Sequence, residues 1–200
     1  MRVLFQERLK LHHRLTFVSR FPAVMIISAL LVLSLSGCSG TQPQKTVPDT
    51  AITQTPENVA RVFAEAVFRG DCPLMFKCYP TQYTESLSEE VLAEFDACGK
   101  DVQAQLQTNA HQYVGTSSQD STLYSTDKTS SLYQEALNTI STETGVSSDE
   151  ISDIRTCIVQ VYFSVDGTNK YQNVQVLVYK YGVDWFAFDV EASTTTETES

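Results

Sequence analysis

The clearest hydrophobic pattern in the chain follows the segment Thr55-Pro56-Glu57. This segment combines an N-cap hydroxyl, a proline at the first helical position and an acid in the first turn. Gly70 supplies a stop signal one helix length later. The apolar residues between them recur at i, i+3, i+4, i+7 and i+8, which predicts a helix with one apolar face: Val59, Val62, Phe63, Ala66 and Val67.

Weaker helical patterns follow. Pro73 to Cys78 predicts a short second helix that Pro80 closes. Ser86-Leu87-Ser88-Glu89 resembles a capping box, and Gly99 is expected to interrupt the helix behind it, with 101–107 as a continuation. The apolar residues of this helix are Leu87, Val91, Leu92 and Phe95.

Between residues 108 and 129 the chain is polar, which predicts a loop with at most one weak strand at 112–115. A further short helix is expected before Gly145, on the apolar residues Leu132, Ala136, Leu137 and Ile140.

The last third of the chain changes to a period of two. Alternation over 157–165, 171–181 and 185–190, with short turns at Asp166-Gly167 and Gly182-Val183-Asp184, predicts three antiparallel strands. Helices first and a sheet last predict an α+β fold, with the N-terminal helices packed on one face of a C-terminal antiparallel sheet.

The start of the chain has the parts of an export signal. Basic residues outnumber acids five to one over residues 1–20, and an apolar run from Phe21 to Leu35 follows. The run ends in Leu35-Ser36-Gly37-Cys38, which resembles the lipobox of bacterial lipoproteins. That resemblance implies cleavage between Gly37 and Cys38 and a diacylglyceryl group on the Cys38 thiol. The alternatives are an ordinary signal peptide and an uncleaved anchor, although 15 residues fall short of the roughly 20 that span a bilayer.

These patterns divide the chain into four parts. Residues 1–37 are the predicted signal peptide, and residues 38–54 are the lipidated cysteine with a polar tether rich in Pro, Thr and Gln. Residues 55–191 form the α+β domain, and residues 192–200 are a predicted disordered tail.

The net charge of the chain limits the classes of partner that it can bind. The whole chain carries −10, and residues 38–200 carry 9 basic against 23 acidic residues, or −14. A nucleic-acid partner is therefore not expected, because such binding needs a basic face. Repulsion from anionic lipid predicts that the domain meets the membrane through its anchor alone.

The domain also resembles a known family. A capped helix ending in Arg69-Gly70-Asp71, a short second helix and a final strand pair closing on YGVDWFAFDV resemble the nuclear-transport-factor-like, or cystatin-like, cone fold. The resemblance covers about residues 56–190, and the 108–150 stretch departs from the compact family plan. It implies a cone-shaped domain of the kind that many bacterial lipoproteins carry after a lipobox and a tether.

Four cysteines remain beside Cys38. A helix over 73–78 would separate Cys72 and Cys78 by roughly 9 Å along its axis, beyond the ~7 Å reach of a disulfide. Of the two remaining pairings we favour Cys78–Cys98 with Cys72–Cys157, and buried free thiols are the alternative. A zinc site is disfavoured, because the gaps of 6, 20 and 59 residues lack a close pair.

Candidate catalytic residues are few. His111 lies in a polar segment with no acid nearby in sequence, and no hydrolase, zinc-protease or phosphate-loop motif occurs. The cone fold implies acid–base enzymes as one option, for which Asp189, Tyr162 and Tyr179 are the candidates. Asp189 is expected at the solvated end of a strand, on the face of Trp185 and Ala187.

The leading hypothesis is a non-enzymatic, membrane-tethered extracytoplasmic domain that binds a protein or a small ligand, with no cofactor. The alternatives are a solute-capturing lipoprotein and an isomerase-like enzyme. Ordinary core packing is the competing explanation for each aromatic residue that would line a pocket: Phe63, Tyr162, Phe163, Tyr179 and Trp185.

Overall fold

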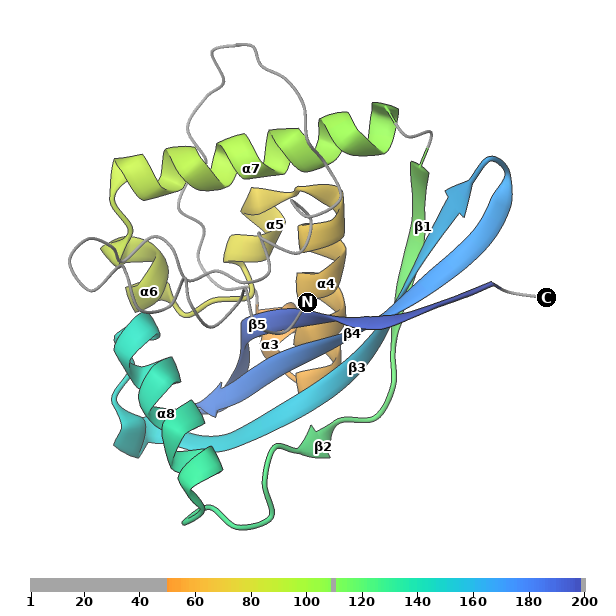
Figure 1. Ribbon diagram of the computed structural model, residues 1–200. Coiled ribbons are helices and arrows are strands. Elements are labelled where there is room, and N and C mark those ends of the chain that lie inside the picture. The colour runs from red at the N-terminus through yellow and green to blue at the C-terminus, as the bar shows by residue number, and fades with distance from the viewer. Residues whose placement is uncertain (1–49, 109–110, 199–200) are drawn as a thin grey trace, which may run out of the picture.

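The computed structural model describes residues 50–108 and 111–198, and the side chains of 51–107 and 111–191 (Figure 1). The predicted signal peptide, Cys38 and most of the predicted tether lie outside the described residues. The elements are α3 (Thr50–Thr53), α4 (Pro56–Arg69), α5 (Cys72–Phe76), α6 (Thr81–Ser86), α7 (Glu89–Thr108), β1 (His111–Ser118), β2 (Thr122–Leu123), α8 (Ser131–Thr144), the 3-10 turn η1 (Ser148–Glu150), β3 (Ile151–Val165), β4 (Thr168–Tyr181) and β5 (Asp184–Thr198).

The strands form one antiparallel sheet with the order β1-β3-β4-β5, and it is not closed into a barrel. The short strand β2 pairs with the first half of β3, along the same edge as β1. Asp166 and Gly167, both at positive φ, form the turn between β3 and β4, as the sequence predicts. Helices followed by an antiparallel sheet confirm the α+β class.

Helix α4 is the centre of the main core. Its ends match the prediction: the Thr55 hydroxyl accepts a hydrogen bond from the Asn58 amide, and Gly70 ends the helix in a left-handed conformation. Its apolar face packs on the inner face of the sheet, and α5 and α7 lie beside it (Figure 1). The inward residues of the three long strands are Cys157, Val159, Val161, Val174, Val176, Val178, Trp185, Ala187 and Val190.

Helix α8 corrects the prediction that the helices share one face of the sheet. It packs on the opposite face, where Ile154, Tyr179 and Phe186 are aligned across β3, β4 and β5. These residues alternate with the inward ones, so the strands are apolar on both faces at this end. In Figure 1, α5 and α7 lie above the strands, α4 overlaps them in this view, and α8 lies at the lower left.

Gly99 does not interrupt α7, contrary to the prediction. The helix runs unbroken from Glu89 to Thr108, and Gly99 packs directly against Gly70 at the end of α4. A Cβ on Gly70 would lie 2.2 Å from the Gly99 carbonyl oxygen. A Cβ on Gly99 would lie 2.7 Å from the Gly70 carbonyl oxygen. Close packing against the end of α4 therefore excludes a larger residue at this position, although glycine has a low helix propensity.

The start of α7 also differs from the predicted capping box. The Ser88 hydroxyl, two residues after Ser86, accepts the Val91 amide at 3.3 Å. Ser86 instead belongs to α6, a helix that the sequence pattern does not indicate. Its hydroxyl donates to the Tyr83 carbonyl at 2.7 Å.

The folded region extends past both predicted boundaries. Helix α3 lies within the predicted tether, and the buried Thr53 hydroxyl donates to the Asp184 carboxylate at 2.8 Å. Strand β5 continues beyond Glu191, and its backbone pairs with β4 up to Thr198 opposite Lys170. On the free edge of β5, the Ala187 amide donates to the Cys78 carbonyl at 2.9 Å, which protects part of that edge.

The 108–129 stretch holds more strand than expected. Strand β1 runs from His111 to Ser118, longer than the weak strand predicted at 112–115, and β2 follows at Thr122–Leu123. Both pair with β3. Backbone pairing with a long neighbouring strand extends β1 over residues that are mostly polar, on both sides of Tyr113 and Val114.

Candidate functional site

The five aromatic residues considered for a pocket do not line a common cavity. Phe63 belongs to the main core and packs edge-on against Tyr79, with ring centroids 5.5 Å apart. Tyr179 lies in the second core, on the other face of the sheet and beneath α8. A single pocket cannot include both, because the sheet lies between them.

Trp185 is the second residue of β5, belongs to the main core and is 7% exposed. The Arg155 guanidinium lies 5.4 Å and the Lys180 ammonium 5.8 Å from its ring centroid. Cations over an indole face stabilise a packed ring. The Arg155 side chain also contacts the Asp153 carboxylate at 3.0 Å, so the ring is enclosed by a charge network.

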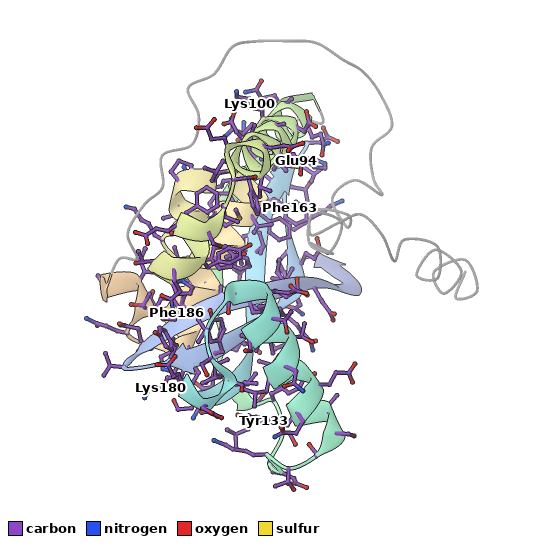
Figure 2. The ribbon with its side chains drawn as sticks, turned by 90° about the vertical axis from the view of Figure 1, so that its left-hand side faces the viewer. Glu94, Lys100, Tyr133, Phe163, Lys180 and Phe186 are labelled. Carbon is purple, nitrogen blue, oxygen red and sulfur yellow. The ribbon has the colours of Figure 1, made fainter. Side chains whose placement is uncertain are left out.

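Tyr162 and Phe163 lie at the far end of the sheet. Figure 2 shows Phe163 well above Lys180 and Phe186, which mark the lower end. Phe163 is 6.1 Å from the His111 ring, and Tyr162 lies 5.9 Å from Tyr171 on the outer face, both measured between centroids. These two residues therefore belong to a different region from Trp185.

Of the candidate acid–base residues, Tyr162 lies apart from Asp189 and Tyr179. Asp189 lies opposite Leu177 on β4, two positions from Tyr179. Tyr162 lies opposite Tyr171, six residues further along β4, which corresponds to roughly 20 Å of strand. The three side chains therefore do not converge on one substrate-sized site.

Asp189 nevertheless differs from the solvated strand end that the sequence suggested. Strand β5 continues past it, and the side chain is partly buried, with its carboxylate accepting the Val190 amide at 2.8 Å. Burial raises the pKa of Asp189 to about 6, and the neighbouring Glu191 adds to the rise. A bulge at Phe188 also shifts the alternation, so Val190, not Asp189, packs with Trp185 and Ala187.

Two hollows in the described part of the chain differ greatly in size. One, of about 10 Å³, has room for a single water and lies between Tyr79, Tyr83, Glu143, Thr144 and Phe188. The other is an open groove of about 320 Å³ beside the contact of α4 with α7, lined by Gly70, Asp71, Cys72, Pro73, Asp96, Lys100 and Gln103. Its charged pair, Asp96 and Lys100, forms an ion pair within α7 at 2.6 Å.

The four cysteines of the domain are free thiols, so neither predicted disulfide is formed. The sulfurs contact three separate carbonyl groups. Cys72 donates to Phe95 at 3.0 Å, Cys78 to Leu74 at 3.7 Å and Cys157 to Pro56 at 3.4 Å. Cys98 is half-buried on α7. The pairing failed because sequence spacing does not say which way each thiol points.

None of these thiols is activated as a nucleophile. Burial raises the pKa of Cys72 to about 11 and that of Cys157 to about 12, and nearby acids add to both effects. Burial and the acids Asp101 and Glu94 also raise the pKa of Cys98. Because the thiolate is the reactive form, each thiol reacts slowly at neutral pH.

This arrangement predicts the outcome of alkylation. We expect the unfolded, unreduced protein to take up four alkyl groups on the domain cysteines, and the native protein to react first at Cys98. The rate should rise between pH 7 and pH 9, since the thiolate fraction increases. Mass spectrometry of the alkylated peptides checks this. Uptake of fewer than four groups without a reductant contradicts the free-thiol assignment.

Other candidate chemistry finds no support in the described residues. They contain no group of three His, Cys, Asp or Glu side chains placed to hold a metal ion. His111 packs near Phe163, at the start of edge strand β1. No helix within residues 50–108 and 111–198 is long and apolar enough to cross a membrane.

Sequence reasoning missed one surface feature. Val183, at the tip of the turn between β4 and β5, is 83% exposed. It precedes Asp184, which holds α3 through Thr53. The signal was an aliphatic residue in the connection Gly182-Val183-Asp184, where polar residues are usual.

The chain was compared with known proteins in three ways. No protein-family model matches it, and neither a curated protein nor a solved structure is similar enough to count as a match.

Proposed function

We propose that this chain is a bacterial lipoprotein, tethered to a membrane through Cys38 and exposed on the extracytoplasmic side. The observation that carries the proposal is Leu35-Ser36-Gly37-Cys38 at the end of an apolar run behind a basic segment. A diacylglyceryl group supplies two acyl chains, enough for stable anchoring, whereas one chain binds only marginally.

The start of the described fold supports a short tether. Helix α3 begins at Thr50, twelve residues after Cys38. A chain of this length spans at most about 40 Å when fully extended. The domain would therefore stay close to the lipid surface. Its nearest part would be the end of the sheet where β5 begins, because α3 contacts Asp184 there.

We further propose that the domain is a non-enzymatic accessory or binding domain. The separation of Asp189 from Tyr162 and the absence of an activated thiol in the described part argue against catalysis by the candidates considered. Of the two defined hollows, one has room for a single water and the other is open, so neither favours capture of a solute. Helices α4, α5 and α7 over one face of an open sheet are compatible with the nuclear-transport-factor-like cone, which stays part of the proposal. Helix α8 on the other face is an addition to that plan.

The anchor is tested by expressing the full chain in a bacterium that processes lipoproteins, with a fatty acid that carries an alkyne label. We expect label in the wild-type protein, an N-terminus at Cys38 and recovery in the membrane fraction. Cys38→Ser should lose the label completely. Cys98→Ser, which removes a half-buried thiol of the domain, is the matched control and should keep it.

Two results would overturn the proposal. One is a wild-type protein that carries no label. The other is a mature N-terminus at a residue other than Cys38, since the lipidated cysteine must be the first residue after processing.

A further inference from the structure

The tether and the turn between β4 and β5 meet at the same end of the domain. The Thr53 hydroxyl of α3 donates to the Asp184 carboxylate at 2.8 Å, and Asp184 is the first residue of β5. The chain therefore enters the fold within a few residues of Val183. If Cys38 carries lipid, this turn is the part of the sheet that the tether holds nearest to the membrane.

The same end presents exposed aliphatic side chains. In the described part of the chain, four large hydrophobic residues are exposed: Val183 at 83%, Val114 at 57%, Leu132 at 55% and Leu123 at 49%. Leu123 lies in β2 and Leu132 in the first turn of α8, and both elements are at the lower end in Figure 1. Val114 lies in β1, which follows the upper half of β3.

The residues that flank Val183 are those that suit a lipid interface. Tyr181 is half-buried, and Lys180, labelled in the lower part of Figure 2, lies with its ammonium over the Trp185 ring. Aromatic and lysine side chains next to an aliphatic tip have an apolar body and a polar end. The turn can thus enter the headgroup region without burying an unpaired charge.

Charge at this end is mixed and does not favour anionic lipid. The sequence-based expectation that only the anchor meets the membrane rests on this charge repulsion, which does not oppose an apolar contact with uncharged lipid. Lys180, Arg155 and Lys128 are accompanied by Asp153, which contacts the last two at 3.0 and 4.0 Å. Other acids at this end are Asp184, which Thr53 contacts, and Glu57, which accepts the Ser121 amide. Exposed acids here are Asp127, which Thr129 contacts in the loop before α8, and Asp149 and Glu150 just before β3.

We infer that the β4–β5 turn docks on the lipid surface, with Val183 inserted, and so fixes the orientation of the domain. The inference rests on the proposed anchor. A tether this short holds the turn at an effective concentration on the order of millimolar or above, so a contact too weak to recruit a free protein is enough to orient a tethered one. The opposite end of the sheet, where Tyr162 and Tyr171 lie, then faces away from the membrane.

Tryptophan quenching tests the contact. Val183→Trp and Val114→Trp are each prepared as the mature acylated protein, in phosphatidylcholine vesicles with and without brominated acyl chains. The wild type is the baseline, since its single tryptophan is 7% exposed. Brominated lipid should quench Val183→Trp about twofold more than the wild type, as expected for an inserted side chain. Val114→Trp, the matched exposed position, should stay at the baseline.

Other results would overturn either the docked orientation or the anchor. Acylated protein in which neither variant is quenched, or both are quenched equally, overturns the docked orientation and leaves the anchor intact. Quenching that appears only after phosphatidylglycerol is added also overturns it, because the contact inferred here is apolar. Absence of the acyl group by mass spectrometry overturns the proposed function, which separates the two failures.

Discussion

Gly70→Ala is expected to destabilise the domain by about 3 kcal/mol or more. Gly70 has φ of 62°, a left-handed conformation that an alanine adopts only at a cost of about 1 kcal/mol. The larger part comes from packing. The new Cβ would lie 2.2 Å from the carbonyl oxygen and 2.9 Å from the carbonyl carbon of Gly99. Both atoms belong to the backbone of a helix, so α7 as a whole must shift away from α4.

Gly145→Ala is the matched control for this experiment. Gly145 ends α8 with φ of 71°, and no atom lies within 4 Å of the position of its Cβ. Its substitution should therefore cost only the backbone strain, about 1 kcal/mol. Urea unfolding of both variants measures the difference in the free energy of unfolding. Equal losses in the two variants would show that the contact between Gly70 and Gly99 does not restrict the helices.

Asp189→Asn is expected to stabilise the domain at neutral pH and to flatten its pH dependence. The pKa of Asp189 is raised from 3.8 to about 6, chiefly by burial. A carboxyl group whose pKa is raised in the folded state binds its proton more tightly there than in the unfolded chain. Its stabilising effect is therefore fully present below pH 3.8 and is lost as the pH rises through about 6.

The expected change in the free energy of unfolding follows from the raised pKa of Asp189. Two pKa units correspond to almost 3 kcal/mol, and partial exposure reduces this to roughly 2 kcal/mol between pH 4 and pH 7.5. Asparagine keeps an acceptor for the Val190 amide and cannot ionise. The measurement is the free energy of unfolding of both proteins at the two pH values. Asp120→Asn, at an exposed position between β1 and β2, controls for the removal of one negative charge.

The decisive quantity in the Asp189 experiment is the gap in the free energy of unfolding between variant and wild type, and how this gap changes with pH. The gap should widen in favour of Asp189→Asn as the pH rises. A gap that stays constant from pH 4 to pH 7.5 would mean that Asp189 is solvated in the folded protein, as the sequence alone suggested.

Local features of the sequence predicted the parts of the fold that depend on neighbouring residues. Helix α4 carries its own start and stop signals, and its apolar stripe follows the helical period, so both ends were predicted correctly. The turn at Asp166-Gly167 needs positive φ at both residues, and the flanking alternation then fixes the register of β3 and β4. These features need no information from distant parts of the chain.

The candidate site was less predictable, because it depends on which distant residues meet. Alternation assigned Asp189 to the face of Trp185, but a bulge at Phe188 exchanges the faces beyond it. Spacing suggested two disulfides, whereas Cys72 and Cys157 each point to the carbonyl group of a different helix. A bulge and the direction of a thiol leave little trace in a single sequence.

By itself the sequence determined the α+β class, helix α4 and the three long strands, because periodicity and turn chemistry act over a few residues. Only the tertiary structure decided that α7 runs through Gly99, that α8 covers the opposite face of the sheet, and that α3 and Val183 lie at one end. Each of these depends on contacts between segments far apart in the chain, and close packing selects among them only when the whole fold has formed.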